Sequence, residues 1–94
     1  MTDVALRYEV NERVLFTALP EGGVLLDLVT KTYFSLNETA AFLWGSVARE
    51  RTGRDELIAQ LVVTFEVEPE QAAEDVDAWV REMKAEGLLR EARA

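Results

Sequence analysis

The chain has 94 residues, 49% of them hydrophobic and 30% charged, and it contains neither cysteine nor histidine. Thiol nucleophiles, disulfides, imidazole bases and the usual zinc sites are therefore excluded, so we do not expect an enzyme. Eighteen acidic and ten basic residues give a net charge of −8, which opposes binding to nucleic acid. We expect the acid excess to serve solubility, with a docking surface for a basic partner as the alternative.

The length suits a single domain with one hydrophobic core. We predict one domain over residues 1–94, with a core from about residue 13 to 90 and an N-terminal arm over residues 1–12. Apolar runs are only a few residues long, so we expect no membrane segment and a soluble, cytoplasmic protein. The oligomeric state, a homo-oligomer included, is left open.

Apolar residues alternate with a period of two up to about residue 36, which predicts strands with one buried face. The first two strands are expected to form a hairpin, because residues 20–23 supply a proline and two glycines suited to a reversing turn. The residues expected to face inward on these two strands are Val14, Phe16, Ala18, Val24, Leu26 and Leu28.

A third strand is predicted over residues 32–36. Its alternation places Phe34 and Leu36 inward and Tyr33 and Ser35 outward. Little of the chain remains to pair with its far side, so this strand is expected to leave a sheet edge open, and an open edge can take up a peptide.

From Asn37 the apolar period becomes helical, and Asn37 is a good N-cap for a helix over about residues 38–50. Thr52 and Asp55 resemble a capping pair for a second helix that ends near Glu66. The apolar stripes of these helices are predicted at Ala40, Leu43, Trp44, Val47 and Ala48, and at Leu57, Ile58, Leu61, Val62 and Phe65.

A third helix is predicted to begin near Pro69 and to be stopped by Gly87, with Leu88 folding back on Met83. Three antiparallel strands followed by three helices predict a small α+β domain of winged-helix shape. The stripe of this third helix is predicted at Ala72, Ala73, Val76, Trp79, Val80 and Met83.

Two features fit this scheme less directly. Leu6, Tyr8 and Val10 also alternate, so the arm either forms another short strand or lies over the body. Phe42 lies opposite the apolar face of its helix, and we favour cover by the N-terminal arm over contact with a partner.

Carboxylates are the remaining catalytic device, and many of them cluster near the third helix. Acid–base catalysis needs two carboxylates in different environments, and adjacent helical positions do not converge on one metal ion. We therefore expect a solvated acidic face without catalysis, metal or cofactor. The residues concerned are Glu68, Glu70, Glu74, Asp75, Asp77, Glu82 and Glu86.

Two aromatic residues permit a structural and a binding interpretation. Trp79 on a helical stripe is most often a core residue, but it could also form the wall of a groove whose margin includes Asp75 and Glu82. Tyr33 could be a solvated strand residue or an anchor for a bound chain.

In order and spacing, the chain from about Gly22 to Arg90 resembles the PqqD-like proteins, also called recognition elements of ribosomally made, post-translationally modified peptides. The departures are Lys31, where the family often has glycine, and a polar turn over residues 50–53. The matching segments are Val24-Leu25-Leu26-Asp27, an aromatic pair before Leu36-Asn37, Thr39-Ala40, Leu43-Trp44, residues 57–61, Val67-Glu68-Pro69-Glu70, Asp75-Val76 and Gly87-Leu88-Leu89.

The resemblance implies a non-catalytic adaptor on which the leader segment of a precursor peptide lies as an added antiparallel strand. The leader would occupy the groove between the third strand and the third helix, where Phe34 and Val76 could equally be core. The residues implied for this groove are Lys31, Thr32, Tyr33, Phe34 and Ser35, with Asp75, Val76, Trp79, Val80 and Met83.

The resemblance leaves two jobs open. A free-standing domain looks like the recognition element of lasso-peptide clusters, which delivers its precursor to a leader peptidase and a cyclase, and we favour this role. It also looks like the chaperone that presents a precursor to a radical enzyme in quinone-cofactor synthesis. From another class, an acidic winged-helix interaction module unrelated to peptide modification remains an alternative.

Overall fold

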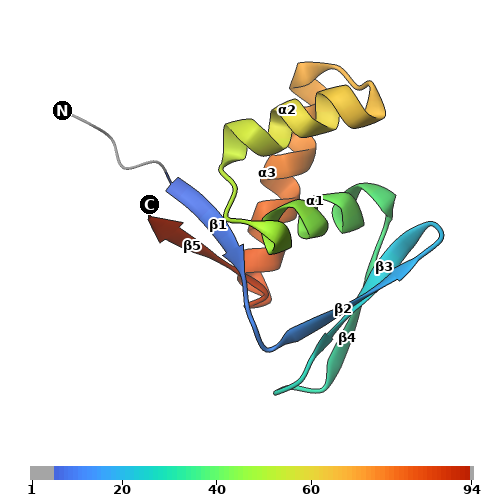
Figure 1. Cartoon of the computed structure of the whole chain (residues 1–94), viewed down its shortest axis with the longest axis vertical. Coiled ribbons are helices and arrows are strands. Elements are labelled where there is room, and N and C mark those ends of the chain that lie inside the picture. Colours follow the sequence, from blue (N-terminus) through green and yellow to red (C-terminus); the bar gives the residue numbers. More distant parts are fainter. Residues whose placement is uncertain (1–5, 94) are drawn as a thin grey trace.

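The computed structural model describes residues 6–93, and the chain forms five strands and three helices there. A three-stranded antiparallel sheet precedes the helices, and the two ends of the described chain meet in a separate strand pair (Figure 1). This confirms the predicted α+β fold and adds the terminal pair. The elements are β1 (Leu6–Val10), β2 (Val14–Leu19), β3 (Gly22–Asp27), β4 (Thr32–Leu36), α1 (Glu38–Arg49), α2 (Arg54–Phe65), α3 (Pro69–Ala85) and β5 (Leu89–Arg93).

The larger sheet has the order β2-β3-β4, so both β2 and β4 are edge strands. Paired residues of antiparallel strands share a face, and Leu25 pairs with both Phe16 and Phe34. The inward direction of Phe16 and Phe34 is therefore confirmed. Leu25 is fully buried below the helices.

The predicted inward face of β3 was wrong, because Gly23, Leu25 and Asp27 are buried there. Val24 and Leu26 lie on the outer face of the sheet, and Leu28 is exposed after the strand. Residues 24–26 are all apolar, so they do not show which of them alternate inward. The inward row also contains an acid, Asp27, where apolar residues were expected.

Asp27 is 1% exposed because its carboxylate organises the turn from β3 to β4. It accepts hydrogen bonds from Arg13 Nε at 3.0 and 3.1 Å and from the main-chain N–H groups of Val29 and Thr30. The hydrogen bond from Arg13, together with these main-chain bonds, holds the pKa of Asp27 below its ordinary value despite burial. Lys31 completes the turn with a left-handed φ of 64°.

Helix α1 begins as predicted, with Asn37 Oδ1 accepting from Ala40 N at 2.8 Å. Helix α2 begins later than predicted, because its N-cap is Gly53 and Glu56 Oε1 accepts from Gly53 N at 2.9 Å. Thr52 is not the cap. It is buried and forms a β-bridge with Tyr8 of β1, which takes its main chain away from the helix.

Helix α3 ends as predicted at Gly87, whose φ is 74°. The N–H of Leu88 donates to Met83 O and that of Gly87 donates to Lys84 O, a closing pattern that needs a left-handed residue. The chain then runs into β5, which pairs antiparallel with β1. The N-terminal arm thus forms a strand, the first of its two predicted alternatives.

Phe42 is partly buried, and helix α2 contributes to its cover. Its ring makes an edge-to-face contact with Phe65 of α2, with ring centroids 5.4 Å apart. The expected cover by the N-terminal arm stays a prediction, because residues 1–5 of that arm lie outside the described residues. Among residues 6–93, no helix is long and apolar enough to cross a membrane.

Candidate functional site

The outer edge of β4 offers main-chain groups that the sheet does not use. Leu28 N donates a hydrogen bond to Arg13 O, so Arg13 and Leu28 form a hydrogen-bonded pair next to the Val14–Asp27 pair of the β2–β3 ladder. Hydrogen-bonded pairs alternate along an antiparallel ladder, so the main chain of Leu25 is directed towards β4, where it meets Phe34. The N–H and C=O groups of Tyr33 and Ser35 are therefore directed outward, away from the sheet.

Beside this edge, β4 and α3 enclose two adjoining hollows of about 540 and 220 Å³, which we call the β4–α3 groove. The first turn of α1 closes one side, because Asn37 and Ala40 line both hollows. The remaining lining residues are Tyr33, Phe34, Ser35, Leu36, Thr39, Leu43, Asp75, Ala78, Trp79, Glu82, Met83 and Glu86.

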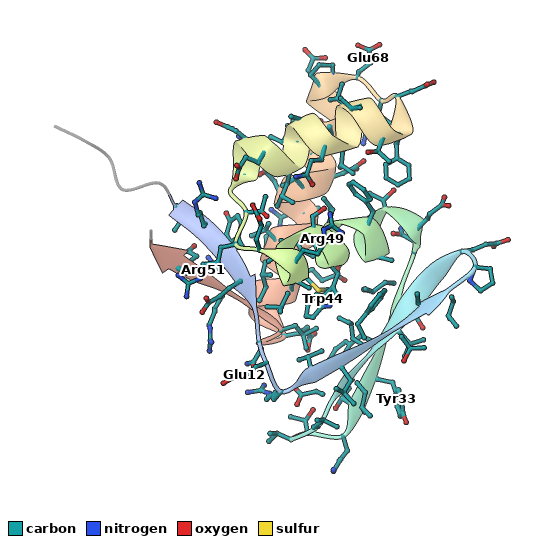
Figure 2. The ribbon with its side chains drawn as sticks, in the orientation of Figure 1. Glu12, Tyr33, Trp44, Arg49, Arg51 and Glu68 are labelled. Carbon is teal, nitrogen blue, oxygen red and sulfur yellow. The ribbon has the colours of Figure 1, made fainter. Side chains whose placement is uncertain are left out.

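Trp79 lines both hollows, although its side chain belongs largely to the core. It is 5% exposed, and its indole Nε1 has no hydrogen-bond partner among residues 6–93. Tyr33 is the opposite case, since it is 69% exposed and stands on the face of the sheet turned away from the helices (Figure 2). Trp79 is thus both a core residue and a wall of the groove, the two roles that the sequence had left as alternatives.

The charged residues of the groove are all acidic. Asp75, Glu82 and Glu86 line it, and neither lysine nor arginine does so. Asp75 Oδ1 accepts a hydrogen bond from Gln71 Nε2 at 2.9 Å, which orients its carboxylate without neutralising it. A groove with one sign of charge attracts the opposite sign, so its electrostatics favour a basic or neutral ligand.

The structure brings six of the ten predicted site residues together around the groove. The other four lie elsewhere. Val76 is fully buried in the core, and Val80 lines a separate hollow on another side of α3, with Asp77 and Arg81. Lys31 and Thr32 are exposed at the turn where β4 begins. The six are Tyr33, Phe34, Ser35, Asp75, Trp79 and Met83.

Sequence reasoning missed the contribution of α1. Asn37 and Ala40 were interpreted only as a cap and a core residue, yet both line the groove. A signal was present, because α1 starts directly after β4 and its first turn must lie beside the end of that strand. Glu86, just beyond the last turn of α3, was also missed as a groove residue.

Comparison with known proteins supports the family resemblance. The structure described as lasso peptide synthetase B1 complexed with the leader peptide is similar, with 26% identity, a TM-score of 0.74, and coverage of 88% of this chain and 96% of that one. The structure described as TbiB1 in complex with the TbiA(beta) leader peptide shares the fold, with 22% identity, a TM-score of 0.77, and coverage of 87% and 94%.

No curated protein matches the chain. The family described as coenzyme PQQ synthesis protein D matches residues 22–89, which include β3, β4 and all three helices. The chain belongs to this family, PqqD.

Proposed function

We propose that the chain is a non-catalytic adaptor that binds the leader segment of a ribosomally made precursor peptide in the β4–α3 groove. One observation carries the proposal: the free main-chain edge of β4 lies directly beside a groove walled by Trp79 and rimmed by acids. The similar structure of lasso peptide synthetase B1, which holds a leader peptide, supports it.

The leader adds to the sheet as an antiparallel strand, paired with the outward main-chain groups of Tyr33 and Ser35. Each main-chain hydrogen bond contributes about 0.5–1.5 kcal/mol whatever the leader sequence. Selectivity comes from side chains. Alternate leader residues face Phe34 and Trp79 in the groove, and a lysine or arginine of the leader lies near Glu82.

Within this function we favour delivery of a lasso-peptide precursor to its leader peptidase and cyclase. The support is the similarity to the lasso synthetase subunit over nearly the whole of both chains. The second candidate is a chaperone that presents a precursor to a radical enzyme in quinone-cofactor synthesis, and the family's description favours it.

Fluorescence polarisation of labelled leader peptides tests leader binding. The peptides come from short open reading frames beside the gene, each with a scrambled copy, at two salt concentrations. We expect one leader to bind saturably, more weakly at high salt, and its scrambled copy not to bind. If the folded protein binds none of these leaders, the adaptor function is refuted in favour of a general interaction module.

N-methylation of the leader tests the strand geometry. Methyl groups on leader amides that pair with Tyr33 or Ser35 should each weaken binding about tenfold, whereas methyl groups on the alternate amides should be tolerated. Equal effects at all positions would contradict strand addition.

Reconstitution separates the two jobs. Purified chain added to the neighbouring leader peptidase and cyclase should accelerate leader removal and ring closure in the lasso role. In the chaperone role it should instead accelerate modification of the precursor by a radical enzyme. Whichever enzymes respond identify the pathway.

A further inference from the structure

The opposite edge of the sheet carries a second unused set of main-chain groups. Hydrogen-bonded pairs alternate along the β2–β3 ladder, and Phe16 and Ala18 belong to the pairs that are not hydrogen-bonded. Their N–H and C=O groups therefore point outward from β2, as those of Tyr33 and Ser35 do from β4. Within residues 6–93 these four main-chain groups have no hydrogen bond outside the sheet. The strand has no proline, no bulge and no charged residue, which are the usual devices that protect an edge from pairing.

An aromatic hollow of about 660 Å³ adjoins this edge, and we call it the β2 hollow. Phe16 and Leu19 line it from β2, Phe42 and Gly45 from α1, and Phe65 from α2. Phe16 and Leu19 are 37% and 49% exposed, so large apolar side chains here are only partly covered. Phe42, which the helical period left unexplained, forms part of this wall.

Gly45 keeps the hollow open. A glycine in the middle of a helix costs about 1 kcal/mol relative to alanine. Nothing in the described fold requires it, because a Cβ at Gly45 would come no closer than 3.8 Å, to Arg49 Nη1. The residue thus lowers helix stability and leaves space free beside Phe42.

The charges at the hollow differ from those of the β4–α3 groove. Arg49, at the end of α1, lines the hollow and forms no ion pair within the described chain, although the protein carries a net charge of −8 (Figure 2). Glu38 lies at the opposite end of α1, near the tip of the β2–β3 hairpin. The tip and the start of α1 are close together, because a Cβ added to Gly22 in the tip would lie only 2.0 Å from Leu36 O, two residues before α1.

We propose that the β2 edge and its hollow form a second strand-addition site, which takes an extended segment of a partner protein carrying a large apolar side chain followed by a carboxylate. The segment pairs antiparallel to Phe16 and Ala18. Its aromatic or aliphatic side chain enters beside Phe42, and its acid pairs with Arg49. This site lies beyond the leader-binding function, and both edges can be occupied at once because two strand spacings, about 10 Å, separate β2 from β4.

The probe for this site is the acetylated, amidated heptapeptide Thr-Leu-Thr-Phe-Thr-Asp-Thr, whose leucine, phenylalanine and aspartate share one face of a strand. Titration into isotopically labelled protein should shift the amide signals of Phe16, Ala18, Gly45 and Arg49 and saturate. The signals of Tyr33 and Ser35 should stay unchanged. No saturable shift at these residues overturns the proposal.

Two variants show where the probe lies. Gly45→Leu fills the hollow and should weaken binding at least tenfold while raising the melting temperature. Ala48→Leu, on an exposed position of the same helix that does not line the hollow, is its matched control and should bind as the wild type. Equal affinity of the Gly45→Leu and Ala48→Leu proteins overturns the proposal.

The charge contact is tested by a double-mutant cycle between Arg49→Gln and the probe with asparagine in place of aspartate. Either change alone should weaken binding about five- to tenfold, and both together should weaken it no further. Additive effects overturn the assigned pair.

Sedimentation of the protein without the probe examines the competing occupant. A monomer at all concentrations agrees with a foreign segment. Self-association that Gly45→Leu abolishes would show that a second copy fills the site and would overturn the proposed partner. Leader binding, measured separately with wild-type protein and Gly45→Leu, distinguishes failure of this proposal from failure of the adaptor function.

Discussion

The two edges of the sheet present the same main-chain chemistry beside different side chains. Both β4 and β2 end the sheet, and neither contains a charged residue. β4 adjoins a groove walled by Trp79 and rimmed with acids, whereas β2 adjoins an aromatic hollow with Arg49 at one end. An edge strand supplies affinity for any extended chain, so the elements packed beside it decide which chain binds.

The largest expected effect comes from Asp27, which supports both edges. Asp27→Ala removes the acceptor of Arg13, at the start of β2, and of two N–H groups in the turn before β4. The turn and the Arg13 side chain lose their shared acceptor, and a gap is left where the buried Asp27 side chain lay, so the melting temperature should fall by more than about 10 °C. Thermal unfolding by circular dichroism measures this, with Glu74→Ala as a control at an exposed acidic residue.

The same carboxylate makes stability depend on pH. The pKa of Asp27 is lowered in the folded state. Its contribution is therefore complete above the ordinary pKa of about 3.9 and is lost as the pH falls through the lower folded value. Urea unfolding between pH 7 and pH 2 should show this loss in wild type and less of it in Asp27→Asn. Identical pH profiles would contradict the assignment.

Trp79→Ala should weaken binding at the β4 edge and leave binding at the β2 edge unchanged. We expect leader affinity to fall about thirtyfold, about 2 kcal/mol, because the groove loses its aromatic wall. Trp79 also packs in the core, so Trp79→Phe serves as the better-folded companion and should show a smaller loss in the same direction. Wild-type leader affinity in folded Trp79→Ala would remove Trp79 from the site.

Proline substitutions compare the two edges directly. Ser35→Pro and Ala18→Pro each remove one outward N–H and leave the ladder to β3 intact. Ser35→Pro should weaken leader binding about tenfold without affecting the heptapeptide probe, and Ala18→Pro should do the reverse. Polarisation titrations with both ligands measure these effects. If Ser35→Pro and Tyr33→Pro both bind the leader normally, the edge-strand mode of binding fails.

The smallest effect is expected at the turn into β4. Lys31 holds a left-handed conformation that costs a non-glycine residue about 1 kcal/mol. Lys31→Gly should therefore raise the free energy of unfolding by about 0.5–1 kcal/mol in urea titrations, while leader affinity changes less than twofold. A decrease in stability would show that the turn depends on the lysine side chain.

The sequence predicted the candidate groove unevenly. Tyr33, Phe34 and Ser35 were placed on the correct faces of an edge strand, because clear alternation specifies direction along a strand. Val76 and Val80 belong to the same helical stripe as Trp79 but face the core and another side of α3. A period of 3.6 residues defines an apolar stripe and does not show which margin adjoins the sheet.

Local patterns by themselves determined the class of fold, the cap at Asn37, the glycine that stops α3 and the open third strand. Each depends on neighbours in sequence, through hydrogen bonds within a turn or the period of a strand or helix. Tertiary structure alone decided that Asp27 is buried, that Thr52 bridges to Tyr8, that β5 pairs with β1, and that Phe42 meets Phe65. These contacts join segments that are distant in the chain, or they depend on which face of an element is covered by another element. Composition and periodicity do not specify which segments pair or which face is covered.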